Sequence, residues 1–150
     1  MNLKYLQREV QRIFNKKESK EVTLQAICNL LESNVSHYDW VGFYFNNGDK
    51  RELKLAQFSG APTAHVTIPF GKGICGQVAE SNKNFIVQDV SEQDNYISCS
   101  WKVKSEIVIP IIADNKNIGQ IDIDSHTVNP FTKKDEKLLE YVCEKVAAML

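Results

Sequence analysis

The spacing of apolar residues predicts helices at both ends of the chain. In residues 2–16 apolar side chains recur every three or four positions between charged ones, the period of an amphipathic helix. The same period predicts a second helix at about 19–37 and a last helix after Thr132, which forms a capping-box pattern with Asp135. The expected apolar stripes of these two helices are Val22, Ile27, Leu30, Leu31 and Val35, and Leu138, Leu139, Val142, Val146 and Leu150.

Between these helices the apolar period shortens to two, which predicts strands. Residues 40–45 are aromatic and β-branched, and a turn signal at 46–49 joins them to alternating residues at 53–57, as in a β-hairpin. Further strands are expected at 65–68, 85–87, 107–112 and 118–124, with a short helix at about 74–81 and a long polar loop at 89–101. This order indicates a single α+β domain over residues 1–150 with a central antiparallel sheet.

Composition and charge narrow the function classes. The 18 basic and 19 acidic residues give a net charge of −1, which argues against a nucleic-acid partner. No apolar run approaches the ~18 residues of a membrane span, and the N-terminal residues do not form a signal peptide, so we expect a cytoplasmic protein. Residues 69–76 match neither phosphate-loop pattern, and no closely spaced cysteine pair indicates a zinc site.

Two of the four cysteines have features of reactive thiols. Cys75 follows two glycines at the expected start of a helix, where the helix dipole favours a thiolate; a buried small residue is the alternative. Cys99 lies in the polar loop near two lysines and is a candidate nucleophile, with an inert loop residue as the alternative. Cys28 falls on a helix stripe and is expected in the core, whereas Cys143 flanks a stripe and is expected in the core or at its boundary.

Acidic residues form a second candidate site. Strand alternation places Asp122 and Asp124 on one face, where two carboxylates repel unless water, a metal or a cationic ligand neutralises them. Glu106 could join them from the neighbouring strand, and the set would suit an ammonium group beside an aromatic wall from Trp40 or Tyr44. A divalent cation could use the same carboxylates, and a solvated sheet face is the plain alternative.

Several motifs, taken in order, resemble those of the free methionine-(R)-sulfoxide reductases, which are GAF domains. The resemblance extends from about Phe14 to Leu150 and implies a GAF fold. In that fold the terminal helices pack on one face of a sheet of about six strands, and a loop-covered pocket lies on the other. The motifs are Trp40-Val-Gly-Phe-Tyr44, Ile68-Pro-Phe-Gly-Lys-Gly-Ile-Cys-Gly76, Tyr96-Ile-Ser-Cys99, Ser105-Glu-Ile-Val-Ile-Pro110 and Ile118-Gly-Gln-Ile-Asp-Ile-Asp-Ser125.

The resemblance also implies a reaction, the reduction of free methionine-(R)-sulfoxide to methionine. Cys99 would attack the sulfoxide and become a sulfenic acid, Cys75 would resolve it as a Cys75–Cys99 disulfide, and thioredoxin would reduce that disulfide. Glu106 is the implied acid. No cofactor or metal is implied, and a homodimer is expected. The implied substrate-binding residues are Trp40, Tyr44, Glu106, Asp122 and Asp124.

The chain departs from the family at His65, where a third cysteine usually stands ten residues before the one matching Cys75. Either Cys75 takes over resolution, which we favour, or an external thiol does, or catalysis is lost. Two other functions therefore stay open. One is a non-catalytic GAF module that binds a small amino-acid-like ligand, and the other is a redox sensor in which Cys75 and Cys99 form a disulfide without substrate.

Overall fold

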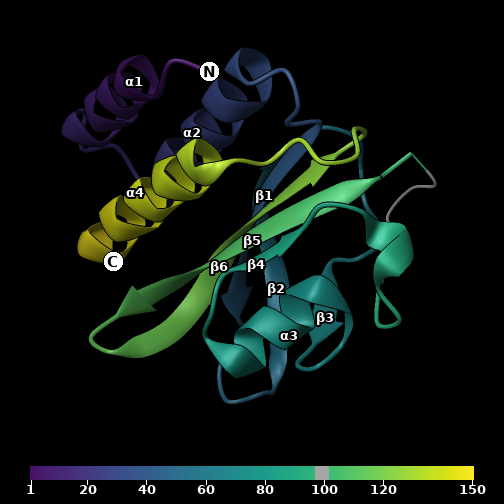
Figure 1. Cartoon of the computed structure of the whole chain (residues 1–150). Coiled ribbons are helices and arrows are strands. Elements are labelled where there is room, and N and C mark those ends of the chain that lie inside the picture. Colours follow the sequence, from purple (N-terminus) through teal and green to yellow (C-terminus); the bar gives the residue numbers. More distant parts are fainter. Residues whose placement is uncertain (97–101) are drawn as a thin grey trace.

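The computed structural model describes residues 1–96 and 102–150, and its centre is a six-stranded antiparallel sheet of order β3-β2-β1-β6-β5-β4 (Figure 1). The strands are β1 (Trp40–Asn46), β2 (Glu52–Ser59), β3 (Thr67–Pro69), β4 (Phe85–Val87), β5 (Ser105–Ala113) and β6 (Lys116–Ser125). The helices are α1 (Leu3–Asn15), α2 (Lys20–Asn34), α3 (Gly73–Ser81) and α4 (Lys133–Met149), with a 3-10 turn η1 (Val90–Glu92). None of the helices in the described part of the chain could span a membrane.

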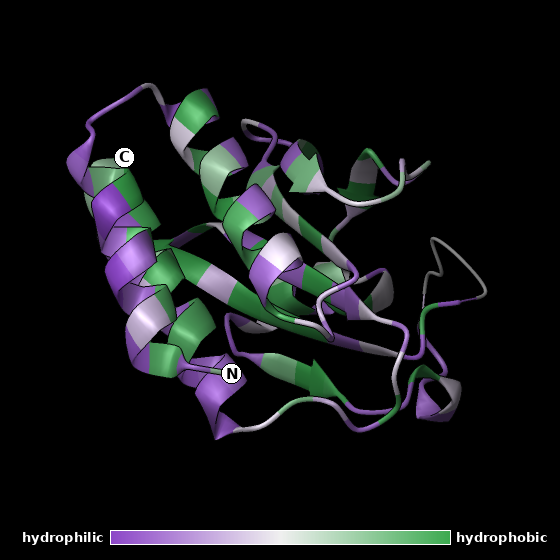
Figure 2. Ribbon diagram, turned by 90° about the horizontal axis from the view of Figure 1, so that it is seen from above, coloured by the Kyte–Doolittle hydropathy of each residue, from purple (hydrophilic) through white to green (hydrophobic). Residues whose placement is uncertain are grey.

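The helices divide between the two faces of the sheet. Helices α1, α2 and α4 form one layer, which contains both ends of the chain, whereas α3 packs on the other face against β5 and β6 (Figure 1). In Figure 2 the helices alternate between hydrophilic and hydrophobic residues, as expected of helices that bury one side. Strand alternation sends Phe43 and Ile123 into the core under the helical layer and leaves Tyr44 and Val108 for a smaller core around α3.

The expected GAF-type α+β fold is confirmed, with small differences at helix ends. Helix α2 ends at Asn34 because Val35 is already extended, and Val22 is 50% exposed. Val22 precedes Ile27 by five residues. Because an α-helix has about 3.6 residues per turn, the Val22 side chain points away from the buried side of the helix. Leu150 is also exposed because it follows the end of α4. Both were wrongly expected on apolar stripes, whereas Cys28 and Cys143 are buried as expected.

The start of α4 is tied to the segment that follows α2 by a buried carboxylate. Asp135 accepts a hydrogen bond from the backbone N–H of Thr132 at 2.7 Å, which completes the expected capping box. Its other oxygen accepts one from the Tyr38 hydroxyl at 2.8 Å and lies 2.7 Å from Nε2 of His37. Burial acts to raise the pKa of Asp135, but these hydrogen bonds outweigh it, so the pKa lies below its ordinary value.

Replacing Asp135 by Asn should lower the free energy of unfolding by about 2–4 kcal/mol near neutral pH. The reason is that the Tyr38 hydroxyl and the Thr132 backbone N–H lose a charged hydrogen-bond acceptor. Since the pKa is lower in the folded state, the carboxylate stabilises the fold above its unfolded-state pKa, and this contribution disappears as the pH falls through the folded-state pKa. Urea unfolding of both proteins from about pH 7 to about pH 3 measures the difference. A difference that does not shrink toward acid would contradict the assignment.

Candidate active site

The three carboxylates expected from the sequence lie together on the sheet face that carries α3. Asp124 of β6 pairs in register with Glu106 of β5 on one side and with Trp40 of β1 on the other. Asp122 lies two residues before Asp124 on β6, and its side chain is therefore on the same face of the sheet. Asp122 and Asp124 are each 4% exposed and Glu106 is 6% exposed. These values exclude the alternative of a solvated sheet face.

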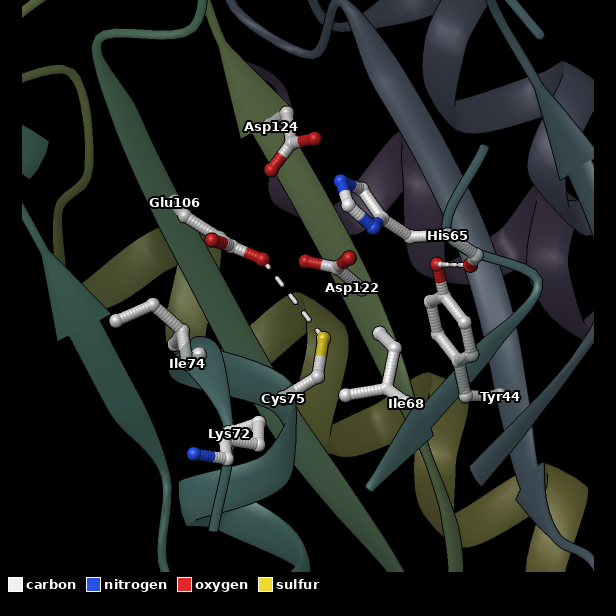
Figure 3. A pocket seen from close by; sticks show the side chains of 10 residues that line it. Tyr44, His65, Ile68, Lys72, Ile74, Cys75, Glu106, Asp122 and Asp124 are labelled. Atoms are coloured by element: carbon white, nitrogen blue, oxygen red, sulfur yellow. Dashed lines mark hydrogen bonds between the residues drawn. The ribbon is translucent and has the colours of Figure 1, made fainter. Parts of the chain in front are cut away.

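The carboxylates line a small, partly enclosed pocket. Figure 3 shows Glu106 and Asp122 pointing toward the same region, with the sulfur of Cys75 beside them and the His65 ring reaching in from the opposite side. The described lining residues are Tyr44, His65, Ile68, Lys72, Gly73, Ile74, Cys75, Glu106, Asp122 and Asp124.

The electrostatics of the pocket favour a cationic ligand. Burial raises the pKa of Asp122. Burial also raises the pKa of Asp124 strongly, and the neighbouring charge of Asp122 raises it further. One oxygen of each carboxyl group, Oδ1, is buried without a hydrogen-bond partner among the described residues. Because a buried carboxylate oxygen without a hydrogen-bond partner is costly, a ligand that brings positive charge and hydrogen-bond donors would be favoured here.

Glycines and a buried amide place Cys75 over the sheet. Gly71 and Gly73 have φ values of +86° and +63°, which favour glycine and let the chain turn into α3. Cys75 is the third residue of that helix, and its backbone carbonyl accepts a hydrogen bond from Nε2 of Gln120 on β6 at 3.1 Å. Helix α3 is thereby fixed with the Cys75 thiol facing the carboxylates.

The expectation that the helix start favours a Cys75 thiolate is wrong in this structure. Burial raises the pKa of Cys75, and the charges of Asp122, Glu106 and Asp124 raise it further. Its Sγ lies 3.8 Å from Oε2 of Glu106 and donates toward it. Cys75 is therefore a buried, protonated thiol, because burial, together with the nearby carboxylates, outweighs the effect of the helix end.

The two expected aromatic residues take different places. Tyr44 lines the pocket, and its hydroxyl donates to the backbone carbonyl of His65 at 2.8 Å. Trp40 lies behind Tyr44, with ring centroids 6.4 Å apart, and stacks on Phe58 at 5.7 Å. A Cβ atom on Gly42 would lie 2.2 Å from the Trp40 ring, so this ring position requires glycine at residue 42.

Replacing Gly42 by Ala should therefore displace the Trp40 ring and lower the free energy of unfolding by about 1–3 kcal/mol, the cost of overpacking. Near-ultraviolet circular dichroism and thermal unfolding measure the two effects. An unchanged aromatic signal together with unchanged stability would contradict the packing described for Trp40.

Sequence reasoning missed several pocket residues. His65 was noted only as a departure from the family pattern, yet its half-buried side chain lines the pocket, as do Ile68, Lys72 and Ile74. The only signal for His65 was its position ten residues before Cys75 in the family pattern. The other three lie on short or irregular segments, where the spacing of apolar residues carries little information.

Cys99, the candidate nucleophile, lies outside the described residues. The segment before it is fixed to the start of α3 through Asn95, whose Oδ1 accepts from the N–H of Gly73 at 3.0 Å. The Asn95 amide also donates to the carbonyl of Gly71 at 2.7 Å, and Gln77 donates to the Asn95 carbonyl at 3.1 Å. The chain that leads to Cys99 thus leaves the described region beside the helix that carries Cys75.

Comparisons with known proteins agree on the family. The GAF domain model matches residues 17–150. The chain is 35% identical to the free methionine-R-sulfoxide reductase of Escherichia coli (strain K12) over 128 residues, which cover 85% of this chain and 76% of that protein. It is 39% identical to Protein YtsP of Bacillus subtilis (strain 168) over 121 residues, 81% of this chain and 74% of that one.

Solved structures give the same result. The structure of fRMsr of Staphylococcus aureus in complex with substrate is 34% identical and has a TM-score of 0.89, with 99% of this chain and 95% of that chain covered. The free methionine-R-sulfoxide reductase from Neisseria meningitidis, also in complex with its substrate, is 28% identical and has a TM-score of 0.92, with 98% and 87% covered. This chain therefore belongs to the GAF domain family and, within it, to the family of the free methionine-R-sulfoxide reductases.

Proposed function

We propose that this chain reduces free methionine-R-sulfoxide to methionine. The observation that carries the proposal is the pair of buried Oδ1 atoms of Asp122 and Asp124, which have no hydrogen-bond partner among the described residues. The ammonium group of a free amino acid supplies the positive charge and the donors that such oxygens need. Tyr44 and Ile68 give the same pocket an apolar side for the methyl and methylene groups of the substrate.

In the proposed reaction the thiolate of Cys99 attacks the sulfoxide sulfur, and oxygen is transferred to the cysteine. The products are methionine and a Cys99 sulfenic acid, so the substrate is reduced by two electrons and Cys99 is oxidised by two. Glu106 is the proposed proton donor to the sulfoxide oxygen, because its carboxyl group lies in the pocket beside the two aspartates.

Cys75 is the proposed resolving thiol. It attacks the Cys99 sulfenic acid, which forms the Cys75–Cys99 disulfide and releases water. The attack requires loss of the Cys75 proton, and Glu106 can accept it across the 3.8 Å contact once it has protonated the substrate. The anchoring of Asn95 beside α3 supports an approach of the two cysteines.

The remaining parts of the proposal rest on the family resemblance. Thioredoxin reduces the disulfide, the protein acts as a homodimer in the cytoplasm, and residues 1–150 form one domain. Trp40 takes part in substrate binding through Tyr44, which it flanks at 6.4 Å.

A second candidate is a GAF module that only binds an amino-acid-like ligand. It is favoured by the raised pKa of Cys75 and by His65 at the position of the usual third cysteine. Both candidate functions would use the acidic pocket to bind a ligand, so only a measurement of turnover distinguishes them.

Comparing the free substrate with its N-acetylated form tests the assignment of the pocket. N-acetyl-methionine-R-sulfoxide lacks the ammonium group. We expect its kcat/KM to be reduced by about 100-fold or more, since removing one partner of a buried charge pair costs about 2–5 kcal/mol. The methyl ester of methionine-R-sulfoxide, which keeps the ammonium group, is the control. Equal turnover of the free and acetylated compounds would contradict ammonium recognition, and binding of the free compound without turnover would favour the binding module.

A further inference from the structure

We propose that the pocket also binds zinc, through Cys75, Glu106 and Asp122, and that zinc inhibits the protein. One possible ligand atom from each of these residues lies within 4.8 Å of the other two, and all three side chains are buried. The Cys75 Sγ and Glu106 Oε2 atoms are 3.8 Å apart. A tetrahedral zinc ion, with bonds of about 2.3 Å to sulfur and about 2.1 Å to oxygen, holds such a pair about 3.6 Å apart, so only a small movement is required.

The unpartnered oxygen of Asp124, a residue outside the three-residue cluster, is a second indication of a cation. Oδ1 of Asp122 and Oδ1 of Asp124 are both buried without a hydrogen-bond partner among the described residues. A dication at this point would neutralise the buried acidic groups that repel one another. Asp122 would coordinate the metal, and Asp124 would lie close enough to contribute through its charge.

The ligand types favour zinc over magnesium or calcium. A thiolate is a soft ligand, whereas magnesium and calcium prefer sites built from oxygen alone. Three protein ligands leave a fourth position for water. The His65 ring reaches toward Asp122 and Asp124 from across the pocket but is not among the three clustered ligands, so we assign it no bond to the metal.

Binding would have two consequences. Zinc must replace the thiol proton of Cys75, so each bound ion releases a proton and a zinc–sulfur bond takes the place of the S–H bond. The bound ion would also occupy Glu106 and Cys75, the proposed acid and the proposed resolving thiol, and would therefore inhibit turnover. Metal binding itself depends only on the geometry of the cluster and can be measured whether or not the chain reduces sulfoxides.

Cobalt provides the direct test, because a cobalt–thiolate bond absorbs in the near ultraviolet. We expect the reduced, chelator-treated chain to bind one equivalent of Co²⁺ with this absorption, and zinc to displace it. Cys75→Ser should abolish the absorption and weaken zinc binding by more than about 100-fold, since even outer-shell changes cost 10–100-fold. Glu106→Gln should keep the absorption and weaken binding, which provides a second variant if the first fails to fold.

The matched control is Cys28→Ser, which removes a buried thiol that donates to the carbonyl of Gln57, away from the pocket. It should leave both the absorption and the affinity unchanged. An absorption that persists in Cys75→Ser, or that disappears only in Cys99→Ser, would overturn the assignment, as would wild-type chain that shows no cobalt–thiolate absorption. Addition of a chelator should reverse the binding and restore the proton to Cys75.

Discussion

Replacing Asp124 by Asn is expected to stabilise the fold and to remove most of the activity. Burial and the neighbouring charge of Asp122 raise the pKa of Asp124, so ionising this group in the folded protein costs free energy at neutral pH. Asparagine has a similar shape and no charge. We expect the free energy of unfolding to rise, because the folded variant no longer buries an ionisable carboxyl group beside a second one.

The same substitution should lower kcat/KM for free methionine-R-sulfoxide by about 100-fold or more, because the proposed buried partner of the substrate ammonium group loses its charge. An increase in stability together with a loss of activity is expected where a binding site lowers the stability of the fold. Thermal unfolding and steady-state kinetics on one preparation measure both. Asp114→Asn makes the same chemical change at an exposed turn and is the matched control.

The pH dependence gives an independent check on Asp124. Because its pKa is raised in the folded state, the protonated carboxyl group stabilises the fold fully below the unfolded-state pKa, and this stabilisation is lost as the pH rises through the folded-state pKa. The stability gain of Asp124→Asn should therefore be largest at neutral pH and should shrink toward about pH 3. A gain that is independent of pH would show that charge is not its cause.

The second large effect concerns the cysteines, whose two proposed roles predict different failures. Cys99→Ser should reduce turnover to the uncatalysed background while substrate binding persists. Cys75→Ser should release about one methionine per chain with thioredoxin and then stop, because the sulfenic acid finds no resolving thiol; a small thiol reductant should restore turnover. Methionine released per chain over time measures both results.

Cys28→Ser is the control for the loss of a thiol. Burial raises the pKa of Cys28 to about 12, so this thiol is inert, and the variant should behave as the wild type does. Normal turnover by Cys99→Ser would remove Cys99 from the mechanism. Continued thioredoxin-dependent turnover by Cys75→Ser would do the same for Cys75.

The sequence predicted the sheet and the acidic face well because both depend on local periodicity. Alternation along 118–124 placed Asp122 and Asp124 on one face, and antiparallel pairing of β5 with β6 brought Glu106 opposite Asp124. The burial of these carboxylates could not be read from alternation, because it depends on α3 and on the segment before β3, which close the pocket from distant parts of the chain.

The state of Cys75 shows the same limit in electrostatic terms. Its place at a helix start suggested a lowered pKa, but burial raises the pKa instead, and three carboxylates on β5 and β6 raise it further. The role of His65 was equally hidden, since its side chain enters the pocket from a loop whose path is set by tertiary contacts such as the hydrogen bond to Tyr44. Local sequence thus predicted which carboxylates share a sheet face better than it predicted the protonation of Cys75.

Methionine release from the separated R and S epimers of free methionine sulfoxide, with thioredoxin and its reductase, tests the proposed function most directly. We predict turnover of the R epimer only, and loss of that turnover in Cys99→Ser. Folded, fully reduced protein that releases no methionine from either epimer would contradict the reductase, and turnover of the S epimer at an equal rate would contradict its specificity.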